Sequence, residues 1–511
     1  MTVKAYAKYL LIMAGLGGLI YGIDVGVIAA ALPYIRNTSN YSSAQLGLVV
    51  GSVLWGSVLS SLFAGSLAEF FGRKKIIIAS AFCFFISIPV ICLSGLFEGG
   101  NFLLLTVGRT LQGASAGLVG VVVPMYLAEC LDSDSRGKGT GMFQLLLTIG
   151  LAFAAVIGLV VTGWVGDSDK ILKPFIDKSA ADAVAAGTIA AAKDFETTFA
   201  MIKSWVTPEQ LKGWAVAWQT IFLCSAVPGF ILFVGAFWLK ESPRWLYKKG
   251  RKEEALASLA ANNGKEKAQS ILNEMIAADA AAEAEKKAIA AASQGDSLWQ
   301  RKYIYPFCLA VVILACNQTT GVNSVLNYTV DIFKATGMEG VFANFSDLAI
   351  KLVNVFMTII ACTLVDKKGR KFLLKVGTSG IILGLCGVAT TFLLISKGVV
   401  VASMTTGVIA TVFFFMFIAF YAVGPGVCVW LALSELMPTR IRAMGMSIAM
   451  IINQGVSATI ATVFPAWKDA WGFPAVFYCL AGFTVIYFIT AAFFLPETKG
   501  KTLEEIEKYF K

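Results

Sequence analysis

The stretch GSLAEFFGRKK at residues 65–75 has a shorter counterpart, DKKGRK, at residues 366–371. Each copy lies between two long apolar runs. Each is also rich in the Lys and Arg residues that gather in the short cytoplasmic connections of membrane proteins. A basic connection of this composition, repeated so far along the chain, indicates two related halves.

Two further pairs of markers repeat in the same order. A Glu and an Arg seven residues apart follow the fourth apolar run, at 129 and 136, and the tenth, at 435 and 442. ESPR at 241–244 follows the sixth run, and PET at 496–498 follows the twelfth. Chance agreement at three places is improbable, and repeated halves are typical of secondary transporters.

Composition places most of the chain inside a membrane. Of its 511 residues, 57% are hydrophobic and 14% are charged, whereas a soluble domain has about 45–50% and about 25%. Twelve apolar stretches match the roughly 20 residues that cross a bilayer as a helix: 9–31, 45–67, 75–97, 101–127, 140–163, 214–238, 304–333, 346–365, 373–395, 402–434, 442–466 and 472–495. The sequence therefore predicts an all-α membrane protein with twelve transmembrane helices in two six-helix pseudo-repeated halves.

The connections define domains and orientation. The N-terminal half at 1–239 contains a long outer loop at 164–213, a helical linker at 240–303 follows, and the C-terminal half at 304–495 precedes a tail at 496–511. Most of the 42 Lys and Arg residues lie in the alternate connections that share a side with the N-terminus. This bias predicts that both termini are cytoplasmic. It also explains most of the net charge of +10 without nucleic acid as a partner.

Charged residues at the cytoplasmic helix ends are candidates for a latch. They can pair across the halves when that side closes, and opening must break those pairs. An exposed pair contributes only about 0–1 kcal/mol, which suits a switch that must reverse. The alternative is that these charges only set the topology. The candidates are Glu69, Arg73, Glu129, Arg136, Glu241, Arg244, Asp366, Arg370, Glu435 and Arg442.

Polar side chains inside the spans are costly and are therefore candidates for function. Amides both donate and accept hydrogen bonds, which suits a neutral polyhydroxyl ligand better than an organic anion. The alternative is hydrogen bonding between helices only. The candidates are Tyr21, Gln144, Asn317, Gln318, Asn323, Asn327, Asn354, Trp430 and Asn453. Gly424 and Pro425 should weaken the tenth span and bend it.

Asp24 and Arg109 are the charged residues expected to couple the ligand to protons. They lie roughly 10 Å and roughly 12 Å from the outer ends of their spans, at about 1.5 Å per residue. An isolated charge at that depth costs at least ~3 kcal/mol, so we expect them to pair. Pairing favours the charged carboxylate, and burial away from the arginine favours the protonated form. A helix shift could therefore load and release a proton, and a static salt bridge is the alternative.

With these motifs the chain resembles the sugar porters of the major facilitator superfamily over essentially its whole length. The 65–75 stretch is shared by the wider superfamily, whereas ESPR at 241–244 and PETKG at 496–500 are more specific. The resemblance implies sugar contacts by Gln144, Gln318, Asn323, Asn354, Trp430 and Asn453. It also has departures that leave the sugar open: Glu69 stands for an aspartate, Asn317 for a glutamine, and Asn327 for the first of two tyrosines, which leaves Tyr328 at the gate.

The resemblance also bears on proton coupling. Bacterial proton–sugar symporters of the family carry an aspartate that matches Asp24, whereas passive animal facilitators usually have asparagine, and Arg109 matches an arginine found in both. This implies import of a monosaccharide, a hexose or a pentose, by proton symport through alternating access. A passive uniporter and a non-transporting sugar sensor of the same fold are the alternatives.

Other classes of function fit poorly. The chain has no histidine, no nucleophile triad and no nucleotide-binding context, so we expect neither an enzyme nor a cofactor or metal. We expect a monomer in the cell membrane, with the bilayer, a sugar and protons as partners. Lys351 lies near the outer end of the predicted eighth span, where snorkelling to the surface is the plain expectation. A role in shaping the outer vestibule is the alternative.

Overall fold

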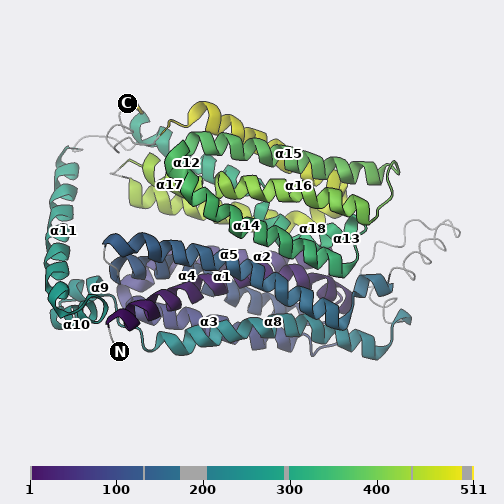
Figure 1. Ribbon diagram of the computed structural model, residues 1–511, viewed down its shortest axis with the longest axis horizontal. Coiled ribbons are helices and arrows are strands. Elements are labelled where there is room, and N and C mark those ends of the chain that lie inside the picture. Colours follow the sequence, from purple (N-terminus) through teal and green to yellow (C-terminus); the bar gives the residue numbers. More distant parts are fainter. Residues whose placement is uncertain are drawn as a thin grey trace.

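The computed structural model describes residues 3–130, 133–172, 204–292, 299–438, 441–497 and 509–510. Two helical bundles lie side by side in Figure 1, the N-terminal half in purple and blue and the C-terminal half in green and yellow. The first half contains α1 (Val3–Thr38), α2 (Ser43–Phe71), α3 (Arg73–Ser94), α4 (Phe102–Cys130), α5 (Ser133–Val165) and α8 (Pro208–Ala236). The linker contains α9 (Pro243–Lys248), α10 (Lys252–Asn263) and α11 (Lys265–Ala292). The second half contains α12 (Arg301–Thr319), α13 (Val322–Ala335), α14 (Gly340–Lys368), α15 (Arg370–Ser396), α16 (Met404–Val423), α17 (Pro425–Leu436), α18 (Arg442–Ile489) and a π-helical turn, η2 (Thr490–Phe494).

The predicted twelve crossings are present among the described residues. Eleven helical stretches are long and apolar enough to cross a membrane, and the last of them, Met444–Phe494, has 51 residues. At about 1.5 Å per residue, that stretch is more than twice as long as the roughly 30 Å hydrocarbon core. Gly472, with φ 75° and ψ 163°, breaks it into two crossings.

Two other crossings are each built from two helices. Gly321, in the left-handed region with φ 78°, separates α12 from α13. Gly424 separates α16 from α17, and Pro425 begins the second helix, where its missing N–H costs no hydrogen bond. The helix is thus interrupted at Gly424 and Pro425, where the sequence predicts a bend.

The repeated sequence markers form the same turn in each half. Gly72 and Gly369 have φ values of 97° and 85°, which favour glycine, and each precedes a helix. Glu241 Oε1 accepts the main-chain N–H of Arg73 at 2.9 Å, and Glu497 Oε1 accepts that of Arg370 at 3.2 Å. A carboxylate is favourable at a helix N-terminus, where N–H groups lack partners. ESPR and PET are thus two copies of one helix cap.

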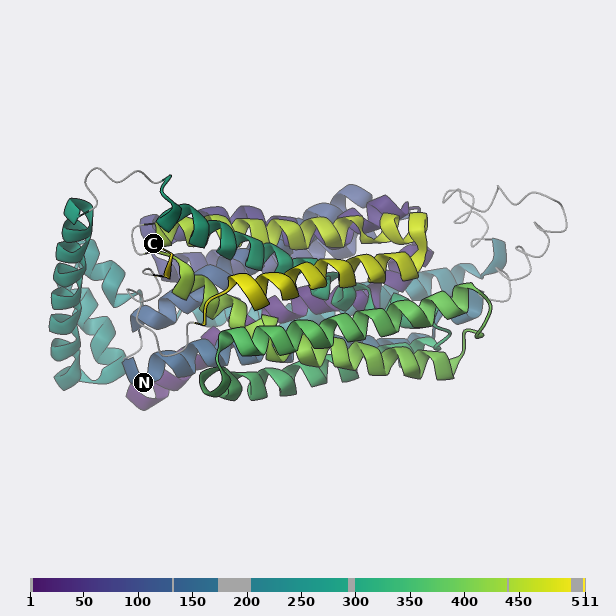
Figure 2. The ribbon, with the colours of Figure 1, turned by 90° about the horizontal axis from the view of Figure 1, so that it is seen from above.

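The linker helices and both ends of the chain lie at the same end of the molecule, which we call the linker end (Figures 1 and 2). The ring of Phe510 lies 5.5 Å from that of Tyr305, near the start of α12. Trp245 of α9 donates to Glu69 O at 2.8 Å and so attaches the linker to the N-terminal half. The opposite end is called the distal end below.

Glycines let α1 and α5 approach closely, which leads to a stability prediction. A Cβ at Gly22 would lie 1.9 Å from the main-chain oxygen of Leu147. Gly22→Ala is therefore expected to lower the free energy of unfolding by about 1–3 kcal/mol, the usual cost of overpacking. Gly120→Ala is the control, because a Cβ there meets nothing within 4 Å. Thermal unfolding in detergent checks this, and equal melting temperatures for the two variants would contradict it.

Candidate substrate and coupling site

A network of amides surrounds the break between α12 and α13. Gln318 Nε2 donates to Asn453 Oδ1 at 3.1 Å, and Asn323 Nδ2 donates to Gln318 Oε1 at 3.0 Å. Gly321 lies between the two segments, so its left-handed turn sets the position of Asn323 relative to Gln318. Three of the predicted site residues therefore come together in the C-terminal half.

The network extends to groups that sequence reasoning missed. Asn453 Nδ2 donates to Leu314 O at 2.9 Å, and Asn323 Nδ2 also donates to Ser457 Oγ at 2.7 Å. Ser457 follows Asn453 by four residues, so the helical period places both on one face of α18. Gln318 and Asn453 are buried, and Asn323 is half-buried. The hydrogen bonds therefore hold the donors and acceptors in fixed positions, and Asn323 is the partly accessible member of the network.

Three other predicted sugar contacts are at least partly accessible. Gln144 is exposed, and Tyr21 and Asn354 are half-buried. The Tyr21 hydroxyl is close to the side chains of Gln454 in the C-terminal half and Ser57 in the N-terminal half. Tyr21 therefore lies where the two halves meet, beside the helix that carries Asn453.

Two further amides line the same crossing. Asn317 and Asn327 are buried, and the side-chain oxygen of each has no hydrogen-bond partner in the described part of the chain. Tyr421 of α16 is close to the Asn317 side chain. The side chains of Arg136, Asp366, Trp430, Glu435 and Arg442 lie outside the described residues, so their roles stay predictions.

The expected ion pair between Asp24 and Arg109 is not formed. Both side chains are buried, yet neither carboxylate oxygen of Asp24 has a hydrogen-bond partner in the part of the chain that is described. Arg109 Nη1 instead donates to the main-chain oxygen of Asp24 at 3.3 Å and to Gln112 Oε1 at 2.9 Å. The contact with the main chain of Asp24 agrees with the prediction that the two residues lie at a similar depth. The guanidinium, however, donates to Gln112, three residues further along the same helix.

At the linker end, Arg73 binds acidic residues of its own half. Its Nη2 and Nε lie 2.7 and 2.8 Å from the two Glu129 oxygens, and Glu69 is 3.7 Å away. Ser242, next to Glu241, donates to Glu129 at 2.5 Å, and Arg244 lies in the first turn of α9. The described partners of the Arg73 side chain therefore all belong to the N-terminal half, and pairing across the halves would require a rearrangement.

At the distal end, ion pairs do join the halves. Arg36 of α1 pairs with Asp331 of α13 at 3.2 Å and with Asp169 at 3.1 Å. Lys334 of α13 pairs with Asp167 at 2.5 Å and with Asp169 at 2.8 Å. Asp169 thus bridges a cation from each half, just beyond the end of α5. These five residues, called the distal cluster below, hold this end closed.

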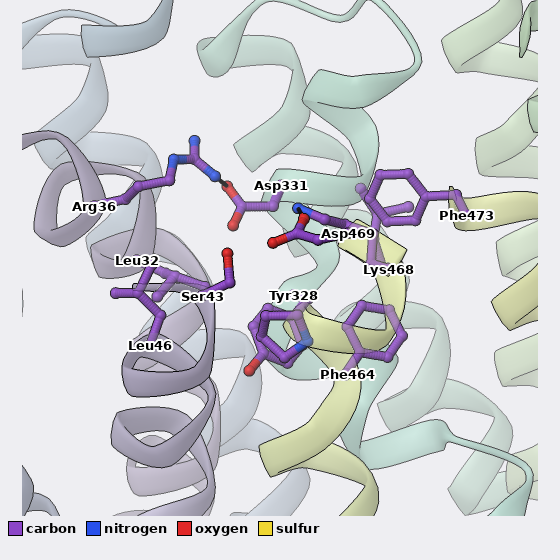
Figure 3. A pocket seen from close by; sticks show the side chains of 12 residues that line it. Leu32, Arg36, Ser43, Leu46, Tyr328, Asp331, Phe464, Lys468, Asp469 and Phe473 are labelled. Carbon is purple, nitrogen blue, oxygen red and sulfur yellow. Dashed lines mark ion pairs between the residues drawn. The ribbon is translucent and has the colours of Figure 1, made fainter. Parts of the chain in front are cut away.

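A small cavity of about 110 Å³ remains beneath the distal cluster. Figure 3 shows Arg36 and Asp331, which both line it, pointing toward one another. Ser43 and Tyr328 also line it, and the Tyr328 ring stacks on that of Phe464 at 4.9 Å between centroids. The Tyr328 hydroxyl donates to Ala461 O at 3.0 Å. Tyr328, the tyrosine expected at the gate, therefore lies in the wall of this cavity.

Lys334→Met is expected to loosen the distal end. The change leaves Asp167 and Asp169 without this ammonium, and hydrogen bonds to charged groups contribute about 1.5–3 kcal/mol. A cysteine at Ser43 should then react roughly tenfold faster with a bulky maleimide. The measurement uses purified protein. The reaction of the native cysteines is measured in the same variant with Ser43 retained, and is subtracted. Lys397→Met, at an exposed lysine of the same end, is the control, and equal rates for both variants would contradict the expectation.

The expectation for Lys351 is wrong. Its side chain is 0% exposed and pairs with Asp347 at 2.7 Å. The span begins at Gly340, six residues earlier than predicted. Lys351 therefore lies roughly 16 Å along the helix at about 1.5 Å per residue, too deep to reach the surface.

Known proteins show the same organisation. The family model described as "Sugar (and other) transporter" matches residues 10–171 and 183–510. The glucose transporter GlcP of Staphylococcus epidermidis is 30% identical, with 98% of this chain and 96% of that protein aligned. The D-xylose transporter of Levilactobacillus brevis is 27% identical, with 99% and 96% aligned.

Solved structures share the fold. The inward open conformation of the xylose transporter XylE from E. coli superposes with a TM-score of 0.73 at 22% identity, covering 99% of this chain and all of that one. The proton:xylose symporter XylE bound to 6-bromo-6-deoxy-D-glucose gives a TM-score of 0.69 at 22% identity, covering 99% and 100%. The chain is therefore a multi-pass membrane transporter, not an enzyme, and belongs to the sugar porter family of the major facilitator superfamily.

Proposed function

We propose that this transporter imports a monosaccharide, a hexose or a pentose, by proton symport through alternating access. The observation that carries the proposal is the amide network of Gln318, Asn323 and Asn453 at the broken crossing. It offers donors and acceptors without a net charge, which matches neutral hydroxyl groups. Asn354, Gln144, Tyr21 and Trp430 complete the proposed contacts.

The proton part rests on Asp24. A buried carboxylate without a partner is very costly, whereas the neutral acid costs far less. Because both oxygens of Asp24 lack partners among the described residues, the arrangement fits a proton-loaded state. Arg109 is near enough to bond the main chain of the same residue, so a modest movement would let it meet the ionised carboxylate. Among the relatives is an arabinose-proton symporter of Bacillus subtilis.

Alternating access is supported by the contacts between the halves. Opening the distal end must break the pairs Arg36–Asp331 and Lys334–Asp169. Closing the linker end would let Glu69, Arg73 and the other latch residues meet the opposite half. We place the linker end and both termini in the cytoplasm and the chain in the cell membrane. We expect it to act as a monomer, with the bilayer, a sugar and protons as partners and without nucleic acid.

A panel of labelled sugars in proteoliposomes tests the substrate class. D-glucose, D-xylose, arabinose and myo-inositol are the first candidates, because relatives are named for them. We expect saturable counterflow of at least one monosaccharide. Binding without counterflow would favour the sugar sensor, and no binding of any of the four would contradict the proposed substrate class.

A further inference from the structure

A buried charge pair lies on α14, where this helix faces α1 of the other half. Lys351 and Asp347, one turn apart on α14, have side chains only 0% and 1% exposed, with Nζ 2.7 Å from Oδ2. The other carboxylate oxygen of Asp347 has no hydrogen-bond partner in the described part of the chain. A buried pair of this kind gives weak net stability, because desolvation offsets attraction. Its presence therefore calls for a role beyond stability.

Lys351 also reaches across to the other half. Its Nζ donates to the main-chain oxygen of Gly26 on α1 at 3.4 Å. Arg109 donates to the main-chain oxygen of Asp24 at 3.3 Å, from within the N-terminal half. One helical turn of α1, which carries the Asp24 carboxylate, is thus held by two buried cations, one from each half.

The two contacts of Lys351 differ in what happens to them when the halves move. Lys351 and Asp347 belong to one helix, so their pair travels as a neutral unit when the halves rock. The contact with Gly26 joins different halves, so it must break when α1 and α14 separate at the distal end. The ammonium can then no longer bond to α1.

We propose that Lys351, held and neutralised by Asp347, is a positioning residue that ties the C-terminal half to the Asp24 turn of α1 and stabilises the closed distal end. This rests on the proposed function, since it assigns Lys351 a part in the alternating-access cycle. It acts through its contact with Gly26. The competing interpretation is a static pair whose charges only compensate one another.

The test uses a neutral double variant, Asp347→Asn with Lys351→Met, because removing one charge alone would leave the other buried without a partner. A cysteine at Ser43, in the distal cavity, reports opening through its reaction with a bulky maleimide on purified protein. We expect the double variant to react roughly threefold to tenfold faster, the effect of losing one hydrogen bond of ordinary strength, because the 3.4 Å contact with Gly26 is long. Lys368→Met, at an exposed lysine of the same helix, should react like wild type.

A folded double variant that reacts at the wild-type rate would overturn the proposal. Should that variant not fold, the exchanged pair Asp347→Lys with Lys351→Asp keeps neutrality but places a carboxylate, which cannot donate, opposite Gly26. It should show the same acceleration, and an unchanged rate would again count against the role. The assay needs no sugar, so failure of the proposed transport function appears separately, as absent counterflow by the wild-type protein.

Discussion

Asp24→Asn should exchange sugar across a membrane but no longer accumulate it. Asparagine has nearly the shape of the acid and can still hydrogen-bond, but it cannot bind and release a proton. Arg109 already bonds the main chain of residue 24 rather than its carboxylate, so the substitution should leave that contact intact. With an imposed proton gradient, the internal-to-external sugar ratio should fall from well above one to about one, while counterflow persists.

The matched control is Asp469→Asn, at a distal aspartate that is 43% exposed and pairs with Lys468. It removes the same charge outside the proposed proton site and should accumulate sugar like wild type. Undiminished accumulation by Asp24→Asn would contradict the role of Asp24. Loss of both accumulation and counterflow, in a folded protein, would instead make Asp24 a binding or structural residue.

Gln318→Ala should cause the second large effect, a loss of sugar affinity. Gln318 is bonded to both Asn453 and Asn323, so its removal takes away its own contacts and releases two neighbours from their fixed positions. A neutral hydrogen bond contributes about 0.5–1.5 kcal/mol, and a buried group left unsatisfied costs about 1–3 kcal/mol. Together these amount to about 1.5–4.5 kcal/mol, or a roughly tenfold to thousandfold weaker Kd for the sugar that wild type binds.

Equilibrium binding to purified protein measures the effect. Thr319→Ala is the control, because the Thr319 hydroxyl bonds to Cys316 O within its own helix and is outside the network. Equal affinities for wild type and Gln318→Ala would show that the amides serve helix packing rather than sugar binding.

The repeated markers predicted the two halves because each half uses the same residues for the same turn. A glycine with positive φ precedes the helix in both halves. Glu241 and Glu497, which lie 168 and 127 residues further along the chain than the N–H groups they accept, cap that helix. The break at Gly424 and Pro425 was predictable because glycine and proline interrupt a helix locally. Membership of the amide network was also predictable, since polar residues inside spans are rare.

Partners across the molecule were not predictable in the same way. Counting residues from the span ends placed Asp24 and Arg109 at one depth in the membrane but gave no side-chain direction. The Arg109 guanidinium donates to Gln112 instead. Lys351 was assigned to the surface because the start of its helix was misplaced, and Asp347 was overlooked. The distal cluster joins residues from α1 and α13 with residues just beyond α5, and no spacing in the sequence indicates that these ends meet.

The most direct test of sugar–proton symport records sugar uptake and external pH together in proteoliposomes that contain the purified wild-type protein. Adding the transported sugar outside, without an imposed gradient, should cause uptake and alkalinisation of the medium, and a proton ionophore should abolish the alkalinisation. Intact sugar flux with no proton movement would contradict symport and identify a passive uniporter.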